Sequence, residues 1–354
     1  EAGDAMTDAL LNVAVGYQAL SGETSGRKSI GIGYGALLVQ NITTNTDVFN
    51  VAIGHFAGGS VTTGQFNTLV GGIAGDALTT GTRNVVLGYN ALTSDTQGSK
   101  SVAIGLGTLQ DQNFTTATDS LNTAVGHGAG SSVTTGTENT LIGGVAGDAL
   151  TTGTQNVAIG VNALGQETDG TYNVAVGREA LKTQNGGTYN IGIGRTAGML
   201  ITTGVQNVII GGNAGDALTD ADENVVIGHT ALTSDTLGSK TVAIGHFALG
   251  FQNFTTATNT YNTAIGYFTG ANVTTGVQNT LLGGLTADAL TTGTHNTALG
   301  TIALSSDTKG NFSVAVGYGT LASQNFTTST DTYNTSVGAY AGNDITPGLE
   351  NTIV

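Results

Sequence analysis

The chain has 354 residues, of which 57 are Gly, one is Pro and none is Cys. Charged residues make up only 9% of the chain, and 9 Lys and Arg against 24 Asp and Glu leave a net charge of −15. This charge repels nucleic acid and anionic lipid, and the lack of Cys excludes a disulfide framework or a thiolate metal site. Because no run of 18 apolar residues occurs, this segment is not expected to insert into a membrane.

A short word recurs along the whole chain: Asn, then three small or apolar residues, then Gly. Clear copies are "NVAIG" at 50–54 and at 156–160. The Gly that ends each word, here called the coil glycine, recurs every 17 residues except for four steps of 21. The coil glycines are Gly16, Gly33, Gly54, Gly71, Gly88, Gly105, Gly126, Gly143, Gly160, Gly177, Gly194, Gly211, Gly228, Gly245, Gly266, Gly283, Gly300, Gly317 and Gly338. So short a period predicts an all-β parallel β-solenoid or β-roll of about 20 coils, because one coil cannot bury its apolar face until neighbours stack on it.

Each position of the coil has its own residue preference. The residue directly before the coil glycine is Val, Ile or Leu in every coil, from Val15 to Val337, and is predicted to be core. The Asn four residues before the glycine is predicted to form a ladder, in which stacked side chains hydrogen-bond to one another and to unpaired backbone groups. The glycine itself is explained by a positive φ at a corner. Representative residues of this structural ladder are Asn50, Asn67, Asn84, Gly54, Gly71 and Gly88.

The three residues between Asn and Gly are apolar or small on both faces of the expected strand. A solenoid has one interior, so the second face needs another cover. The economical cover is another copy of the chain, which favours a homotrimer or another closed oligomer.

A second period covers four coils. The residue four places after the coil glycine alternates in pairs, as in Leu20, Leu37, Gly58 and Gly75. We therefore expect one continuous repeat domain, 1–354, with super-repeats at roughly 1–72, 73–144, 145–212, 213–284 and 285–354. Both ends match the middle of a repeat unit, which predicts a fragment of a longer fibrous protein.

The four longer steps contain loops such as "QNFTTATDSLN" at 112–122, and loops on a rigid scaffold often carry recognition. The candidate recognition residues are Asn113, Phe114, Thr115, Asn253, Phe254, Thr255, Asn325, Phe326 and Thr327. A row of Phe beside Asn and Thr suits weak, repeated stacking on sugar rings. In the alternative interpretation, the Phe rings fold back to cover the solenoid or pack between subunits.

Other polar positions give weaker signals. The Asp-rich corners at Asp95, Asp235 and Asp307 are candidate sites for structural calcium, although each offers only one carboxylate and calcium needs several oxygen ligands. The Asp of "GDAL", as in Asp76, is expected to cap a turn, and His55 occupies a variable slot that is expected to be a solvated outer corner. No catalytic arrangement of Ser, His and Asp or of paired carboxylates stands out. We therefore expect no enzyme, no catalytic or metal residues and no cofactor.

The repeat word resembles the head repeats of YadA-like trimeric autotransporter adhesins and similar repeats of phage tail fibres. The closest matches are "NVAIG" and "SVAIG" at 101–105, although the coil here is longer than in those heads. The resemblance implies a left-handed, homotrimeric β-roll outside the cell, at a cell or virion surface, with a role in attachment. A cell-surface glycan or protein receptor is the expected partner, besides the chain itself.

An ice-binding, or other water- or carbohydrate-binding, β-solenoid is the alternative function. It is suggested by the recurring "TTG" and the low charge. Ordered water needs a flat Thr array, however, and two adjacent Thr side chains cannot share one face of a strand.

Overall fold

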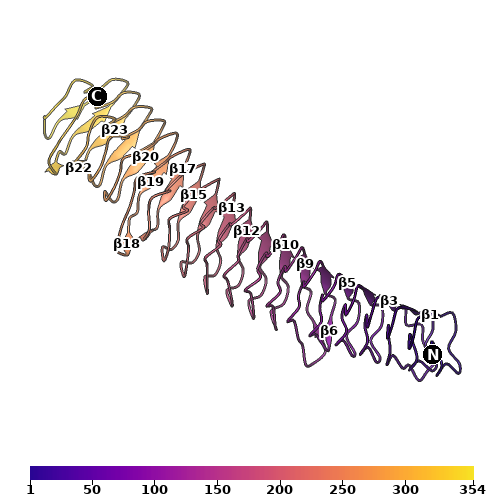
Figure 1. The fold of residues 1–354 in the computed structure, drawn as a ribbon. Coiled ribbons are helices and arrows are strands. Elements are labelled where there is room, and N and C mark those ends of the chain that lie inside the picture. Colours follow the sequence, from indigo (N-terminus) through magenta and orange to yellow (C-terminus); the bar gives the residue numbers. More distant parts are fainter. The chain divides into compact units, whose positions relative to one another are not determined.

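The computed structural model describes residues 1–354 and contains strands and turns but no helix. The chain forms two compact units, Glu1–Asn173 and Val174–Val354, called unit 1 and unit 2. Within each unit the strands of successive coils pair in parallel, as Figure 1 shows. The predicted all-β parallel solenoid of about 20 coils with 17-residue spacing is confirmed. The single continuous domain with five super-repeats stays a prediction.

One main strand per coil builds the sheet of each unit. In unit 1 the main strands are β1 (Val13–Val15), β2 (Ile30–Ile32), β3 (Val51–Ile53), β4 (Thr68–Val70), β5 (Val85–Leu87), β7 (Val102–Ile104), β9 (Thr123–Val125), β10 (Thr140–Ile142) and β11 (Val157–Ile159). In unit 2 they are β12 (Val174–Val176), β13 (Ile191–Ile193), β14 (Val208–Ile210), β15 (Val225–Ile227), β17 (Val242–Ile244), β19 (Thr263–Ile265), β20 (Thr280–Leu282), β21 (Thr297–Leu299), β23 (Val314–Val316), β25 (Thr335–Val337) and β26 (Thr352–Ile353).

Three of the longer steps add a second, two-residue strand pair. These pairs are β6 (Gly98–Ser99) with β8 (Thr118–Asp119), β16 (Gly238–Ser239) with β18 (Thr258–Asn259), and β22 (Gly310–Asn311) with β24 (Thr330–Asp331). In the remaining longer step, Arg27 and Asp47 form a single bridge. Figure 1 shows β6 and β18 on loops opposite the main strands of their units.

Of the three residues of each main strand, only the middle one points into the interior of the coil. Ala52 and Leu69 are fully buried, whereas Val15 is 55% exposed and Ile53 is 39% exposed. The prediction that the residue before the coil glycine is core is therefore wrong. Side chains alternate along a strand, so a strand of three residues directs one side chain inward and its two neighbours outward.

The four-coil period is a packing pattern. The coil that carries Gly58 places Val61 in the core, whereas the coil that carries Leu92 places Asp95 at the equivalent core position. A Cβ atom on Gly58 would lie 2.6 Å from Leu69 Cδ1 and 3.1 Å from Leu37 Cδ2. Glycine therefore recurs where a large side chain of a neighbouring coil fills the interior to the density that protein cores require.

The Leu residues at the same position are held in the left-handed backbone region. Leu20 has a φ of 51° and Leu37 a φ of 52°. This conformation costs a non-glycine residue roughly 1–2 kcal/mol. Both side chains are fully buried, and burying a Leu side chain contributes about 1.5–3 kcal/mol, which offsets the backbone strain.

The recurring Asn side chains connect each coil to the next. The backbone N–H of Asn67 donates to Asn50 Oδ1 at 2.8 Å, and that of Asn84 donates to Asn67 Oδ1 at 3.0 Å. Asn67 Nδ2 also donates to the carbonyl of Gly81 at 2.9 Å. These buried amides satisfy backbone groups that the corner leaves unpaired.

The coil glycine needs its lack of a side chain for two reasons. Gly54, Gly71 and Gly88 have φ values of 141°, 135° and 148°. In addition, a Cβ atom on Gly71 would collide with the carbonyl oxygen of Gly88 in the next coil. Both the backbone angle and the close approach of neighbouring coils thus require glycine.

Candidate functional site

The outward side chains of the main strands form an uncharged surface in each unit, here called the sheet face. It consists of the two residues that bound each three-residue main strand, and all of them are Val, Ile, Leu or Thr. Leu87 is 47% exposed and Leu299 is 44% exposed. With strands about 10 Å long and about 4.8 Å apart, the sheet face covers roughly 50 Å² per coil and about 400 Å² in unit 1. Apolar patches of this size commonly mark an interaction surface.

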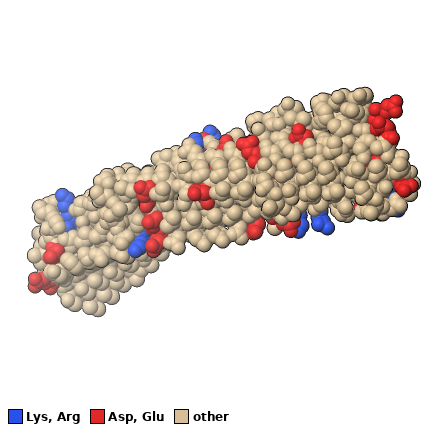
Figure 2. All heavy atoms as spheres, turned by 90° about the horizontal axis from the view of Figure 1, so that it is seen from below, with Lys and Arg blue, Asp and Glu red and all other residues tan.

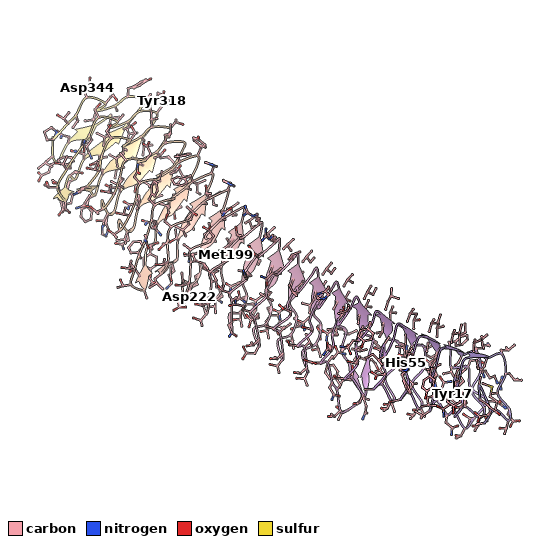
Figure 3. The ribbon with its side chains drawn as sticks, viewed as in Figure 1. Tyr17, His55, Met199, Asp222, Tyr318 and Asp344 are labelled. Atoms are coloured by element: carbon pink, nitrogen blue, oxygen red, sulfur yellow. The ribbon has the colours of Figure 1, made fainter.

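A column of large side chains follows the coil glycine on one side of the sheet face. In unit 1 the rings of Tyr17 and Tyr34 stack with centroids 5.4 Å apart, and Tyr34 stacks on His55 at 5.4 Å. In unit 2, His246 stacks on His229 and on Tyr267, both at 5.5 Å. Figure 3 labels Tyr17 and His55, which belong to this column in unit 1. The side chains of the column are exposed, as the sequence predicted for an outer corner.

A second column lies on the other side of the sheet face, at the residue before the ladder Asn. Phe49 stacks on Phe66 at 5.8 Å, and Phe312 stacks on Tyr333 at 5.4 Å. Lys28 Nζ lies 5.0 Å from the centroid of the Phe49 ring. This column was not predicted from the sequence, although large side chains stand directly before the ladder Asn in many coils.

The Phe rings of the longer loops are not displayed to solvent. Phe114 and Phe254 are 6% exposed, and Phe326 is 8% exposed. This is the arrangement of the alternative interpretation, in which the rings fold back over the solenoid, so they offer no surface for a sugar to stack on. The adjacent Thr115, Thr255 and Thr327 are exposed.

The Asn residues of these loops are tied to the preceding coil. Asn113, Asn253 and Asn325 each accept a hydrogen bond through Oδ1, at 3.2, 3.3 and 3.2 Å. The donors are the hydroxyls of Thr96, Thr236 and Thr308, which belong to the coil before each loop.

Buried carboxylates lie beneath the longer loops. Asp95 Oδ2 accepts a hydrogen bond from Gln112 Nε2 at 2.6 Å, and Asp95 Oδ1 accepts from the backbone N–H groups of Gly98 at 2.9 Å and Phe114 at 3.1 Å. Gln112 also accepts a bond from Asn122 Nδ2 at 2.8 Å. The pairs Asp235 with Gln252, and Asp307 with Gln324, repeat this arrangement.

The carboxylates of Asp95, Asp235 and Asp307 do not form an open site for calcium. The three carboxylates are fully buried, and their oxygens accept N–H groups rather than facing a common open site. Burial raises the pKa of Asp95, and the hydrogen bonds from Gln112 and the backbone oppose that shift. No group of three or more His, Asp or Glu side chains is arranged to hold a metal ion.

The Asp of the "GDAL" motif, and of its variant "ADAL" at 287–290, keeps one oxygen unpaired. Asp76, Asp148 and Asp288 each have a buried Oδ1 without a hydrogen-bond partner. Burial raises the pKa of all three, and backbone hydrogen bonds lower it by a smaller amount. The Asp216 carboxylate differs because it accepts a 2.6 Å bond from the Thr233 hydroxyl.

Charged side chains are sparse on the surface. Figure 2 shows scattered blue and red residues, some of them adjacent, on a largely uncharged surface. Two of the ion pairs, Lys28 with Asp47 at 2.8 Å and Lys100 with Asp119 at 2.6 Å, connect a longer loop to the preceding coil. No helix of the chain has the length and apolar character needed to cross a bilayer.

No protein-family model matches the chain, and no characterised protein matches it in sequence. The coil geometry, the parallel register and the Asn ladder define it as a parallel β-solenoid repeat protein.

Proposed function

We propose that the chain is a shaft or head segment of an extracellular fibre that attaches to a cell or another surface, as bacterial adhesins and phage tail fibres do. The observation that carries this proposal is the sheet face, whose side chains are half-buried or exposed in one copy of the chain and which has no charged residue in any coil. The resemblance of "NVAIG" and "SVAIG" to YadA-like head repeats supports the same function and a left-handed roll.

Self-association through the sheet face gives such a fibre its strength. Burying roughly 50 Å² of aliphatic surface contributes about 1 kcal/mol per coil at the usual 25 cal/mol per Å². Association costs roughly 4–15 kcal/mol in lost freedom of motion. A single coil cannot supply this amount, whereas a stack of nine main strands, as in unit 1, supplies about 10 kcal/mol. A homotrimer covers the sheet faces with closed symmetry.

Sedimentation equilibrium of the full chain tests this proposal. We expect a trimer that dissociates when Ile53→Lys and Ile104→Lys place charges on the sheet face. Thr63→Lys is the matched control, because Thr63 is exposed but lies outside the main strands. A wild-type chain that stays monomeric at all concentrations would refute the assembly, and dissociation by Thr63→Lys would refute the role of the sheet face.

The alternative, an ice-binding solenoid, has less support. The Thr62 hydroxyl donates to the carbonyl of Thr79 at 3.1 Å, and the Thr79 hydroxyl donates to the carbonyl of Thr96 at 2.8 Å. One Thr of each "TTG" thus bonds to the next coil and does not present its donor to ordered water. A thermal-hysteresis assay separates the two functions, because an attachment fibre gives no hysteresis.

A further inference from the structure

A groove of about 720 Å³ opens on the side of unit 2, near the longer loop that begins at Gln252. This volume lies within the range of about 300–1,000 Å³ that is usual for ligand sites. Its lining includes Phe251, Asn253, Asn272, Thr274 and Thr291, and it has no charged side chain.

Phe251 provides an aromatic platform in this groove. Its side chain is 50% exposed, unlike the buried Phe254 of the same loop. The ring is supported by Phe247, which lies perpendicular to it with centroids 5.1 Å apart and in turn packs against Phe268 at 5.1 Å. A supported, half-exposed ring gives a ligand a large contact area at little cost in conformational entropy.

The polar groups beside Phe251 are held in place but keep free hydrogen-bonding capacity. Asn253 uses its Oδ1 to accept a bond from Thr236, which leaves Nδ2 as a donor. Asn272 uses its Nδ2 to donate to the carbonyl of Asp288 at 2.7 Å, which leaves Oδ1 as an acceptor. The groove therefore offers a donor and an acceptor within one lining, and a sugar hydroxyl can use both.

The chemistry of the lining favours a neutral ligand. A sugar ring presents an apolar C–H face that fits Phe251 and hydroxyl groups that fit the two amides. An anionic glycan would gain no cationic partner in the groove and would approach a chain with a net charge of −15.

Coil packing does not require an aromatic residue at this position. The equivalent residue of the other three longer steps, six places after the coil glycine, is Val39, Asp111 or Ser323. Those coils form the same main strands without it. Among the longer steps, Phe251 is thus a feature of this super-repeat alone.

We propose that the groove at Phe251, Asn253 and Asn272 binds a neutral oligosaccharide, with one sugar ring stacked on Phe251 and its hydroxyls bonded to the two amides. This inference rests on the proposed attachment function and names its ligand class and its site.

The test applies the labelled full chain to an array of neutral and anionic glycans, followed by calorimetric titration of the best neutral oligosaccharide on the array. Phe251→Ser, which installs the residue type found at Ser323, is expected to weaken binding about tenfold or more. Asn272→Ala is expected to weaken it as well. Tyr333→Ser is the matched control, since Tyr333 is 54% exposed but lies outside the groove, and it should leave binding unchanged.

Thermal unfolding of each variant checks that the fold is intact. The inference is overturned if no neutral glycan binds, if only anionic glycans bind, or if Phe251→Ser binds as tightly as the wild-type chain. Sedimentation equilibrium on the same samples tests the fibre proposal separately, because a trimer without glycan binding refutes the groove and leaves the assembly standing.

Discussion

Asp95 must act only as a hydrogen-bond acceptor in its buried pair with Gln112, and we predict that a donor at this position destabilises the coil. Asp95→Asn replaces Oδ2, which accepts from Gln112 Nε2 at 2.6 Å, with a second donor. Rotating the new amide turns its donor toward the N–H groups of Gly98 and Phe114 instead. Rotating Gln112 turns its Nε2 toward Asn122 Nδ2. Every arrangement therefore leaves two donors facing each other.

The expected cost follows from this geometry. Each buried donor left unpaired costs about 1–3 kcal/mol. Removing a buried charge offsets part of this cost, because burial raises the pKa of Asp95 and thus opposes its ionisation at neutral pH. We expect Asp95→Asn to destabilise the surrounding coils by about 1–3 kcal/mol in net terms.

The compensating change is Gln112→Glu. In the double variant, the carboxylate introduced at position 112 accepts from the amide introduced at position 95 and from Asn122 Nδ2, so every donor again has an acceptor. Stability should return to within about 1 kcal/mol of the wild-type chain. Gln112→Glu alone places two carboxylates at 2.6 Å and should destabilise the coil at pH 7 more than at pH 4.5, where the pair holds a proton.

Hydrogen exchange is the appropriate assay, because it reports the opening of the coils around Asp95 separately from the rest of the repeat array. The exchange rates of the Gly98 and Phe114 amides report the local opening free energy directly. Asp111→Asn removes an exposed carboxylate nearby and should leave these rates unchanged. Unaltered protection in Asp95→Asn, or no rescue in the double variant, would refute the reasoning.

Three further predictions concern pH, the coil glycine and the loop Phe. Burial raises the folded-state pKa of Asp76 above 3.8, so the stability that its protonated form contributes is complete below that value and is lost as the pH rises through the folded pKa. The thermal midpoint should therefore increase from pH 7 toward pH 4, and it should increase less in Asp76→Asn. A steady fall of the midpoint over this range would contradict the sign. Gly71→Ala should lower stability by at least about 2 kcal/mol in denaturant titrations because of its φ and its contact with the next coil, whereas Gly144→Ala, with nothing within 4 Å, should be nearly neutral. Phe114→Ala should cost about 3–5 kcal/mol by cavity formation, yet leave glycan binding at the unit 2 groove unchanged; equal stability would show that the ring is not core.

The sequence predicted the coil, its period and its parallel stacking because these features follow from spacing alone. It assigned the wrong inward residue because Ile53 and Ala52 are both apolar, and composition cannot distinguish the two faces of so short a strand. The interior of the coil is set by the middle residue of the main strand, which ranges from Ala52 to Leu69, together with the side chains that return from the opposite side.

The candidate site was harder to predict because its contacts join residues far apart in the chain. Taken one at a time, Asp95 and Gln112 have the polarity of surface residues. They are buried because two coils 17 residues apart stack and pair the two side chains. Phe114 likewise reads as an exposed loop residue until the backbone N–H that fixes it to Asp95 is known. A column-by-column comparison of coils would have shown that the position of Asp95 alternates with Gln and aliphatic residues, which is a pattern of interior positions.

The Asn ladder gives the solenoid a direction of growth. The side chain of Asn67 uses both its oxygen and its amide nitrogen on the coil that follows it, through the Asn84 N–H and the Gly81 carbonyl. A finished coil therefore presents an acceptor and a donor, already aimed, to the chain that emerges after it. The opposite edge presents backbone groups instead: the Asn67 N–H and the Gly64 carbonyl, which the side chain of Asn50 in the preceding coil binds. A chain that is synthesised or exported N-terminus first can thus assemble like a zipper, each closed coil serving as the template for the next.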